Sequence, residues 1–240
     1  MFLLAPVVVP ILVVYVLAAV LPAIFLMRYV YRHDTVEKEP AGLLGGLLVR
    51  GVLSALCASV LEGLAQSVLD TLVDPGSPVY TILLAFLVVA LAEEGMKLFF
   101  LKRRTWNDPN FNYRFDGVVY AVFVSLGFAA YENILYVFNF GLGTALLRAV
   151  SAVPAHLSFA VVMGVFYGRA RLLENRGAVA AARLSQVWAL LSAILLHGFY
   201  DACAMIGTSL STITFVAFVV LMFIGVYGLI KQESYADEPL

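Results

Sequence analysis

Two adjacent glutamates, Glu93 and Glu94, lie inside an apolar segment, residues 77–101, that is otherwise long enough to cross a lipid bilayer. On insertion scales, one charged side chain at the bilayer centre destabilises the inserted helix by about 2.5–3.5 kcal/mol. Two carboxylates followed by Lys97 therefore indicate a functional site rather than a stabilising feature. Paired carboxylates in a poorly hydrated site suit acid–base chemistry, in which one takes a proton while the other stays paired.

Four further ionisable residues fall at similar depth in other apolar segments: Glu132, His156, His197 and Asp201. His197 and Asp201 are four residues apart, so they project from the same face of a helix. An aspartate in that position can accept a hydrogen bond from one imidazole nitrogen and leave the other nitrogen free to act.

The same spacing relates Glu93 to Lys97. We expect Lys97 to pair with Glu93, and Glu94, about 100° further around the helix, to face a different neighbour. One glutamate would then handle water while the other is held by Lys97 or a histidine, and the residues leave open which is which.

Two histidines and glutamate inside a membrane suit a hydrolytic site. A glutamate can take a proton from water, while histidines either bind a metal that acidifies the water or bond to the developing oxyanion. The sequence has no HExxH motif, so zinc requires Glu94, His156 and His197 to converge. A non-catalytic alternative is a polar network that holds helices together. So many ionisable groups at comparable depth favour catalysis.

The elements that position these residues are predicted to be transmembrane helices. Of the 240 residues, 62% are hydrophobic and 13% are charged, against about 25% charged in a soluble domain. Runs of about 20 apolar residues separated by short charged loops predict an all-α polytopic bundle in a lipid bilayer. We expect a single transmembrane domain, residues 1–240, with a catalytic core at 78–205. The predicted spans are 4–29, 42–62, 78–101, 115–139, 146–168, 186–206 and 210–230.

Charge in the loops predicts the orientation. Lys and Arg concentrate in the first, third and fifth loops, whereas the second and sixth have none and the fourth has only Arg148. By the positive-inside rule this places the N-terminus outside and the C-terminus inside. We therefore expect a multi-pass protein of the cell inner or plasma membrane. Arg50 and Glu62 are interpreted as interfacial, and no basic, aromatic-rich patch indicates binding to nucleic acid.

The segment 115–137 supplies candidates for supporting roles. Asp116 opens the predicted fourth span, where a carboxylate is favourable near a helix N-terminus. Glu132 and Asn133 lie toward the outer end of the same span. Pro154 is expected to kink the fifth span close to His156, because it removes a backbone hydrogen bond.

Four motifs follow one another along the chain. EEGMK at 93–97 matches an EExxK pattern, and FDGVVYAVFVSLGFAAYENILY at 115–136 matches an FDGxxY…GFAxxEN block. His156 in its own span and HGFYD at 197–201 complete the set. Taken in order, these motifs resemble those of the PrsW family of bacterial intramembrane proteases. The chain is more distantly similar to CAAX prenyl endopeptidases and bacteriocin-processing membrane proteases. The resemblance covers about 78–205.

The resemblance implies an endopeptidase that cuts a membrane-anchored protein, such as site-1 cleavage of a transmembrane anti-sigma factor. It implies catalytic roles for Glu93, Glu94, His156 and His197, with Asp201 as the supporting carboxylate. Lys97, Glu132, Asn133 and Asp116 would support them. Catalysis by a glutamate-activated water and catalysis by zinc both remain open.

Three other interpretations have weaker support. A proton-coupled transporter or channel could use the same buried chain, but the sequence shows no inverted repeat. A retinal-type receptor needs a lysine in the last span, and 210–230 contains none. A non-catalytic scaffold is disfavoured because every motif residue is present.

Overall fold

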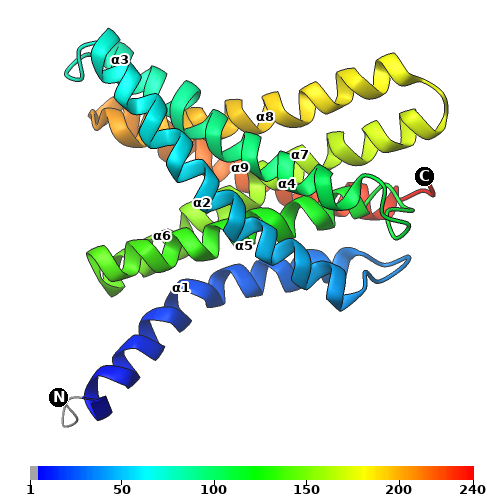
Figure 1. Cartoon of the computed structure of the whole chain (residues 1–240), viewed down its shortest axis with the longest axis horizontal. Coiled ribbons are helices and arrows are strands. Elements are labelled where there is room, and N and C mark those ends of the chain that lie inside the picture. Colours follow the sequence, from blue (N-terminus) through cyan, green and yellow to red (C-terminus); the bar gives the residue numbers. More distant parts are fainter. Residues whose placement is uncertain (1–4) are drawn as a thin grey trace.

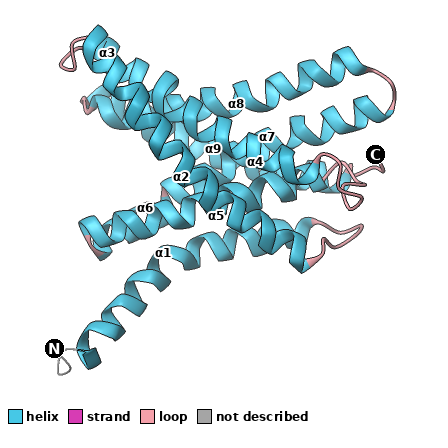
Figure 2. Cartoon of the chain, viewed as in Figure 1, coloured by secondary structure: helices cyan, strands magenta, loops and turns pink. Residues whose placement is uncertain are grey.

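The computed structural model describes residues 5–240, with side chains from residue 9 onward, and the elements in this range are helices (Figures 1 and 2). The only pairing of β type in this range is an isolated bridge between Tyr113 and Pro239. The helices are α1 (Ala5–His33), α2 (Ala41–Leu72), α3 (Pro78–Leu83), the π-helix η1 (Leu84–Ala90), α4 (Leu91–Thr105), α5 (Asp116–Phe140), α6 (Leu142–Val150), α7 (Ala152–Asn175), α8 (Val179–Ile206) and α9 (Ser209–Tyr235).

Over residues 5–240, seven helical segments run along the bundle, which confirms the predicted all-α polytopic fold. Within the described range, six segments are long and apolar enough to cross a membrane, with α6 and α7 counted together. The remaining segment is α3–η1–α4, whose backbone stays helical at both junctions. This segment carries Glu93, Glu94 and Lys97, and it is divided among three elements of 6, 7 and 15 residues.

The loops alternate between the two ends of the bundle. Figure 1 shows the loops at 34–40, 106–115 and 176–178 at the same end as the C-terminus, whereas α1 begins at the opposite end. The C-terminal residues bind the third loop: Leu240 donates from its amide to the Asn112 carbonyl at 2.8 Å, and Arg114 to the Glu238 carbonyl at 3.0 Å. The odd-numbered loops therefore share one side, as the charge pattern requires. The assignment of that side to the cytoplasm stays a prediction.

Several helices extend beyond their predicted spans, because a helix can continue into the interface or past it. The largest difference is α2, which continues to Leu72 instead of ending near 62. A second difference concerns the fifth span. The predicted kink at Pro154 is instead a break at Ser151 (φ −122°, ψ −78°) between α6 and α7. Pro154 lies in the first turn of α7, where a missing N–H leaves no helical bond unmade.

The π-helix η1 ends just before the two glutamates. Insertions of this kind change the direction of side chains and are frequent at functional sites. Phe86 of η1 packs against Gly198 of α8 so closely that a Cβ on Gly198 would lie 2.3 Å from the phenyl ring. This glycine therefore allows the α3–η1–α4 segment to approach α8 next to His197.

Helices α5 and α7 also meet through glycines. A Cβ added to Gly164 would lie 2.5 Å from the Cα of Val118, and one added to Gly117 would lie 2.6 Å from the Gly168 amide nitrogen. Backbone atoms cannot move away as a flexible side chain can. Small residues thus fix the distance between the helix that carries Glu132 and the helix that carries His156.

We expect Gly164→Ala to destabilise the protein by about 1–3 kcal/mol, because the added methyl group overpacks the α5–α7 contact. Activity should fall as well, since the two helices would separate at the site. Thermal unfolding of the purified protein measures the first effect. Gly228→Ala in α9 is the matched control, because a Cβ there would meet no atom of another described helix within 4 Å. Equal stability of the two variants would contradict the proposed packing role.

Candidate active site

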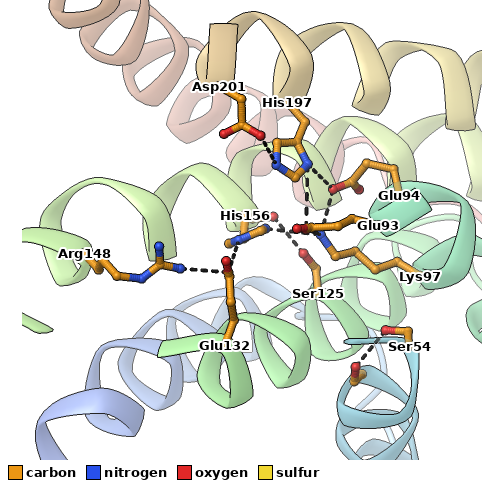
Figure 3. Close-up of polar contacts among 11 residues, drawn as sticks. Ser54, Glu93, Glu94, Lys97, Ser125, Glu132, Arg148, His156, His197 and Asp201 are labelled. Atoms are coloured by element: carbon orange, nitrogen blue, oxygen red, sulfur yellow. Dashed lines mark hydrogen bonds and ion pairs between the residues drawn. The ribbon is translucent and has the colours of Figure 1, made fainter. Parts of the chain in front are cut away.

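Polar side chains from α4, α5, α7 and α8 converge inside the bundle (Figure 3). The exposed fractions are 0% for Glu94, 1% for Lys97, 4% for His156 and His197, and 5% for Glu93. The sequence places these five residues on three separate segments and Glu132 on a fourth, and the structure brings them into hydrogen-bonding contact. Such burial requires that each charge has a partner.

Lys97 lies at the centre of this cluster. Its Nζ is 2.7 Å from Glu94 Oε1, 3.0 Å from Glu93 Oε2 and 3.2 Å from His156 Nδ1. The Phe128 ring covers it at 3.9 Å from the ring centroid. The prediction that Lys97 pairs with Glu93 is confirmed. The prediction that Glu94 faces a different neighbour is only half right, because the flexible lysine side chain reaches both carboxylates.

His197 lies between two carboxylates. Its Nδ1 is 2.9 Å from Glu94 Oε1, and its Nε2 is 3.3 Å from Asp201 Oδ2. The contact with Asp201 is the one that the four-residue spacing predicts. Because an ionised carboxylate only accepts hydrogen bonds, both ring nitrogens of His197 carry a proton in this arrangement.

His156 has the complementary arrangement. An ammonium group only donates, so Nδ1 of His156 accepts from Lys97. The ring proton is then on Nε2, which donates to Glu132 Oε2 at 3.0 Å. Ser125 fixes the backbone at this point by donating to the His156 carbonyl at 3.0 Å. The two histidines therefore differ in protonation because their partners differ.

Arg148 is a site residue that sequence reasoning missed, since the charge pattern indicates only a loop charge at this position. It lies on α6 and donates from Nη2 to Glu132 Oε2 at 2.7 Å and from Nε to Asn133 Oδ1 at 3.1 Å. Asn133 in turn donates to the Ala19 carbonyl of α1 at 2.9 Å. An isolated arginine near a loop offers no spacing signal, so only the fold could reveal this contact.

Arg148→Met should destabilise the protein by about 1.5–3 kcal/mol, because Glu132 loses a charge-assisted hydrogen bond. His156 should then be held less firmly, so that the activity of the site also falls. Thermal unfolding and an activity assay measure the two effects, and Arg183→Met at an exposed position of α8 is the control. If Arg148→Met and Arg183→Met behave alike, the contact with Glu132 contributes nothing.

The two glutamates differ in their access to a cavity. A cavity of about 200 Å³ is lined by Glu93, both histidines, Asp201, Glu132 and Arg148, whereas Glu94 does not line it. Glu62 of α2 lines the same cavity. The sequence interpretation of Glu62 as a structural or interfacial residue did not include this contact with the cavity, which arises because α2 continues past Glu62 and packs beside η1. Glu93 is thus the carboxylate of the pair that can meet a water molecule from this cavity.

A second cavity of about 500 Å³ adjoins the first. The two share Tyr136, Arg148, Ala152, Tyr200, Asp201 and Met205. The second cavity continues between α6 and α9, where Leu147 and Phe215 line it. Its predominantly apolar lining can hold side chains of a polypeptide beside the polar cavity.

Asp116 does not join this cluster. Its carboxylate accepts from the amides of Asn112 at 3.0 Å and Tyr113 at 2.7 Å, at the opposite end of α5 from Glu132. In the structure, Asp116 therefore holds the loop between α4 and α5 in place and does not contact the buried cluster.

Three buried residues of the cluster have side chains that can bind a metal ion; we call them the donor set. Ligand atoms of Glu93, Glu94 and His156 all lie within 4.8 Å of one another. Carboxylate oxygens and an imidazole nitrogen are common zinc ligands. Glu94 Oε2 is also buried without a hydrogen-bond partner among the residues that the structure describes. The zinc set predicted from the sequence contained His197 in place of Glu93, but in the structure the pairing of His197 with Glu94 and Asp201 takes up both of its nitrogens.

Comparisons with known proteins agree with the geometry. The chain matches the family described as "PrsW family intramembrane metalloprotease" over residues 39–228. It is 35% identical to Protease PrsW of Geobacillus kaustophilus, over 77% of this chain and 76% of that protein. It is 32% identical to Protease PrsW of Bacillus subtilis, over 90% of this chain and 93% of that protein. No solved structure matches. The chain belongs to the PrsW family and is a multi-pass, membrane-embedded protease.

Proposed function

We propose that this protease is an endopeptidase that cleaves a membrane-anchored protein, and that its intramembrane glutamates and histidines carry the reaction. The observation that supports this most is the polar cavity lined by Glu93, His156 and His197 inside an otherwise apolar bundle. Family membership favours the protease over the proton-coupled transporter, which would use the same residues for a different purpose. The core at 78–205 would then be catalytic, with Glu62 added from α2.

Glu93 takes the proton from the attacking water. It lines the cavity, and only one of its oxygens is engaged in a short contact, with Lys97 at 3.0 Å. Glu94 has no such access and instead holds Lys97 and His197 in place. Cavity access thus supports Glu93 as the base and Glu94 as the positioning residue.

The carbonyl oxygen of the substrate gains negative charge as water attacks. Hydrogen-bond donors are needed to stabilise this charge. Arg148, His156 and His197 all line the cavity. The N–H groups of the two histidines face Glu132, Glu94 and Asp201, so each histidine would exchange one carboxylate for the carbonyl oxygen as the charge develops. Arg148 uses two of its five N–H groups in the contacts with Glu132 and Asn133, so others can reach a substrate. Asp201 keeps His197 oriented toward the site.

A metal ion held by Glu93, Glu94 and His156 would supply Lewis-acid polarisation and a more acidic water. The roles of Asp201 as an orienting group and of Arg148 as the partner of Glu132 are the same with or without that ion.

The substrate is a polypeptide tethered to the membrane next to the site. The apolar cavity between α6 and α9 adjoins the polar one and can hold the residues that flank the cleaved bond. A transmembrane anti-sigma factor is the substrate class that the resemblance to the family implies, and we propose it for this protein.

The test is cleavage of a single-span reporter, built from an anti-sigma factor of the source organism, by the purified protein in proteoliposomes. We expect one cut near the bilayer surface, located by mass spectrometry of the products, and no cut with the variant Glu93→Gln. The exposed residue Glu37 provides the control Glu37→Gln. Cleavage that persists in Glu93→Gln would reject the proposed site. Proton flux that depends on Glu93, without cleavage of any reporter, would favour the transporter.

A further inference from the structure

The ammonium of Lys97 contacts the same three residues that could hold a metal ion. The three residues that it contacts, Glu93, Glu94 and His156, are the three whose ligand atoms group within 4.8 Å. An ammonium has three N–H donors, and each of these contacts takes one. The lysine thus contacts every residue of the donor set as a built-in cation, and its side chain is 1% exposed.

A metal ion and this ammonium cannot share the site. Zinc binds oxygen and nitrogen ligands at about 2.0–2.2 Å, so an ion bound by all three ligands would stand within contact distance of Nζ. Two cations that close repel each other strongly in a poorly hydrated interior. The Phe128 ring at 3.9 Å closes another side of the ammonium, so Lys97 must leave its ligands for an ion to enter.

The charge balance of the site favours the exchange. Glu93, Glu94, Glu132 and Asp201, together with Glu62 on the same cavity, contribute five carboxylates. The cations are three when His197 carries both protons: Lys97, Arg148 and His197. The difference of five minus three leaves two negative charges in excess. A divalent ion that replaces the single charge of Lys97 at these ligands halves the excess. The lysine side chain is also long and flexible, so its ammonium can move away from these ligands.

We infer that Lys97 is an internal competitor for the metal site: its ammonium holds Glu93, Glu94 and His156, and a divalent metal ion binds only by displacing it. The inference rests on the proposed site, but it concerns the binding of the ion and requires no substrate. Its consequence is that the lysine weakens metal binding although it lies among the ligands. If the ammonium holds these ligands about 90% of the time, the apparent affinity for the metal falls about tenfold.

The experiment titrates the full-length protein in detergent with Co²⁺, followed by absorption of the bound ion, and then with Zn²⁺ as competitor. We expect Lys97→Met to bind the ion about tenfold more tightly than the wild type. Lys102→Met, which removes a solvent-exposed lysine of the same helix that bonds to Gln186, should match the wild type. In the double variant Lys97→Met/His156→Ala the gain should vanish. Affinity in Lys97→Met equal to or below that of the wild type, a gain that survives loss of His156, or no binding to either protein would each overturn the inference.

A measurement on the wild type covers the case in which Lys97→Met fails to fold. Isotope-labelled lysine side chains report on each ammonium by NMR, and Lys97→Gln, which retains hydrogen-bonding capacity, identifies the resonance of Lys97. Saturating Zn²⁺ should shift this resonance to that of an ammonium without its carboxylate partners. An unchanged resonance with Zn²⁺ bound would overturn the inference. Reporter cleavage is measured separately, so loss of the proposed function and loss of metal competition are distinguishable.

Discussion

Glu93→Gln is expected to reduce reporter cleavage by about 10²–10⁴-fold, the usual contribution of a positioned acid or base. The substituted amide retains the shape of the side chain and can still accept from Lys97, but it cannot take a proton from water. Because Glu93 lines the cavity and has a single short partner, thermal unfolding should change little. The measurement is the initial rate of cleavage in proteoliposomes, at equal amounts of folded protein.

Glu94→Gln separates the two glutamates. It should also abolish cleavage, but for a different reason, because Glu94 is fully buried and bonded to both Lys97 and His197. Removing its charge breaks a buried ion pair, and such changes destabilise by about 3–5 kcal/mol. We therefore expect a lower melting temperature for Glu94→Gln than for Glu93→Gln. Equal melting temperatures would contradict the separate roles, and full activity of both variants would falsify the site.

Loss of either buried histidine should have the second largest effect. His156→Ala and His197→Ala are each expected to reduce cleavage by about 10²–10³-fold, the contribution of one donor to a developing oxyanion. His156→Ala also releases Glu132 and Lys97, whereas His197→Ala releases Glu94 and Asp201. Initial rates of reporter cleavage measure both effects. Wild-type turnover in either variant would remove that histidine from the mechanism.

Two further variants sharpen this prediction. Asp201→Asn should reduce the rate only about 10–100-fold, because Asp201 orients His197 and does not react. The asparagine oxygen can still accept from Nε2, which makes the change conservative. His33→Ala is the control, since His33 ends α1 and its ring contacts the Tyr29 carbonyl. A loss in Asp201→Asn as large as in His197→Ala would indicate that the aspartate takes part directly.

Local regularities in the sequence predicted several features that the structure contains. The four-residue spacing of His197 and Asp201, and of Glu93 and Lys97, depends only on helix geometry, so both contacts were predictable. Charge alternation in the loops predicted which loops share one end of the bundle (Figure 1). Runs of apolar residues predicted the helices themselves, with the fourth span, 115–139, closest to the structure.

Contacts between segments that are far apart in the sequence could not be predicted from these local patterns. Arg148 looked like a loop charge, and Glu62 like an interfacial residue, because nothing in their sequence neighbourhood shows where α6 and α2 pack. The break at Ser151 could not be placed either. A proline permits a kink, but the packing of α6 beside α5 decides where the helix breaks.

The sequence by itself determined that ionisable residues lie on four membrane-spanning helices, since composition and periodicity are local properties. It also determined, through the order of its motifs, the family to which the chain belongs. Only the tertiary structure decided that Glu93 faces the cavity while Glu94 is enclosed, and that Lys97 binds both together with His156. The physical reason is that a side chain's partners depend on how neighbouring helices rotate and approach, and glycines such as Gly198 and Gly164 set that approach through contacts far apart in the chain.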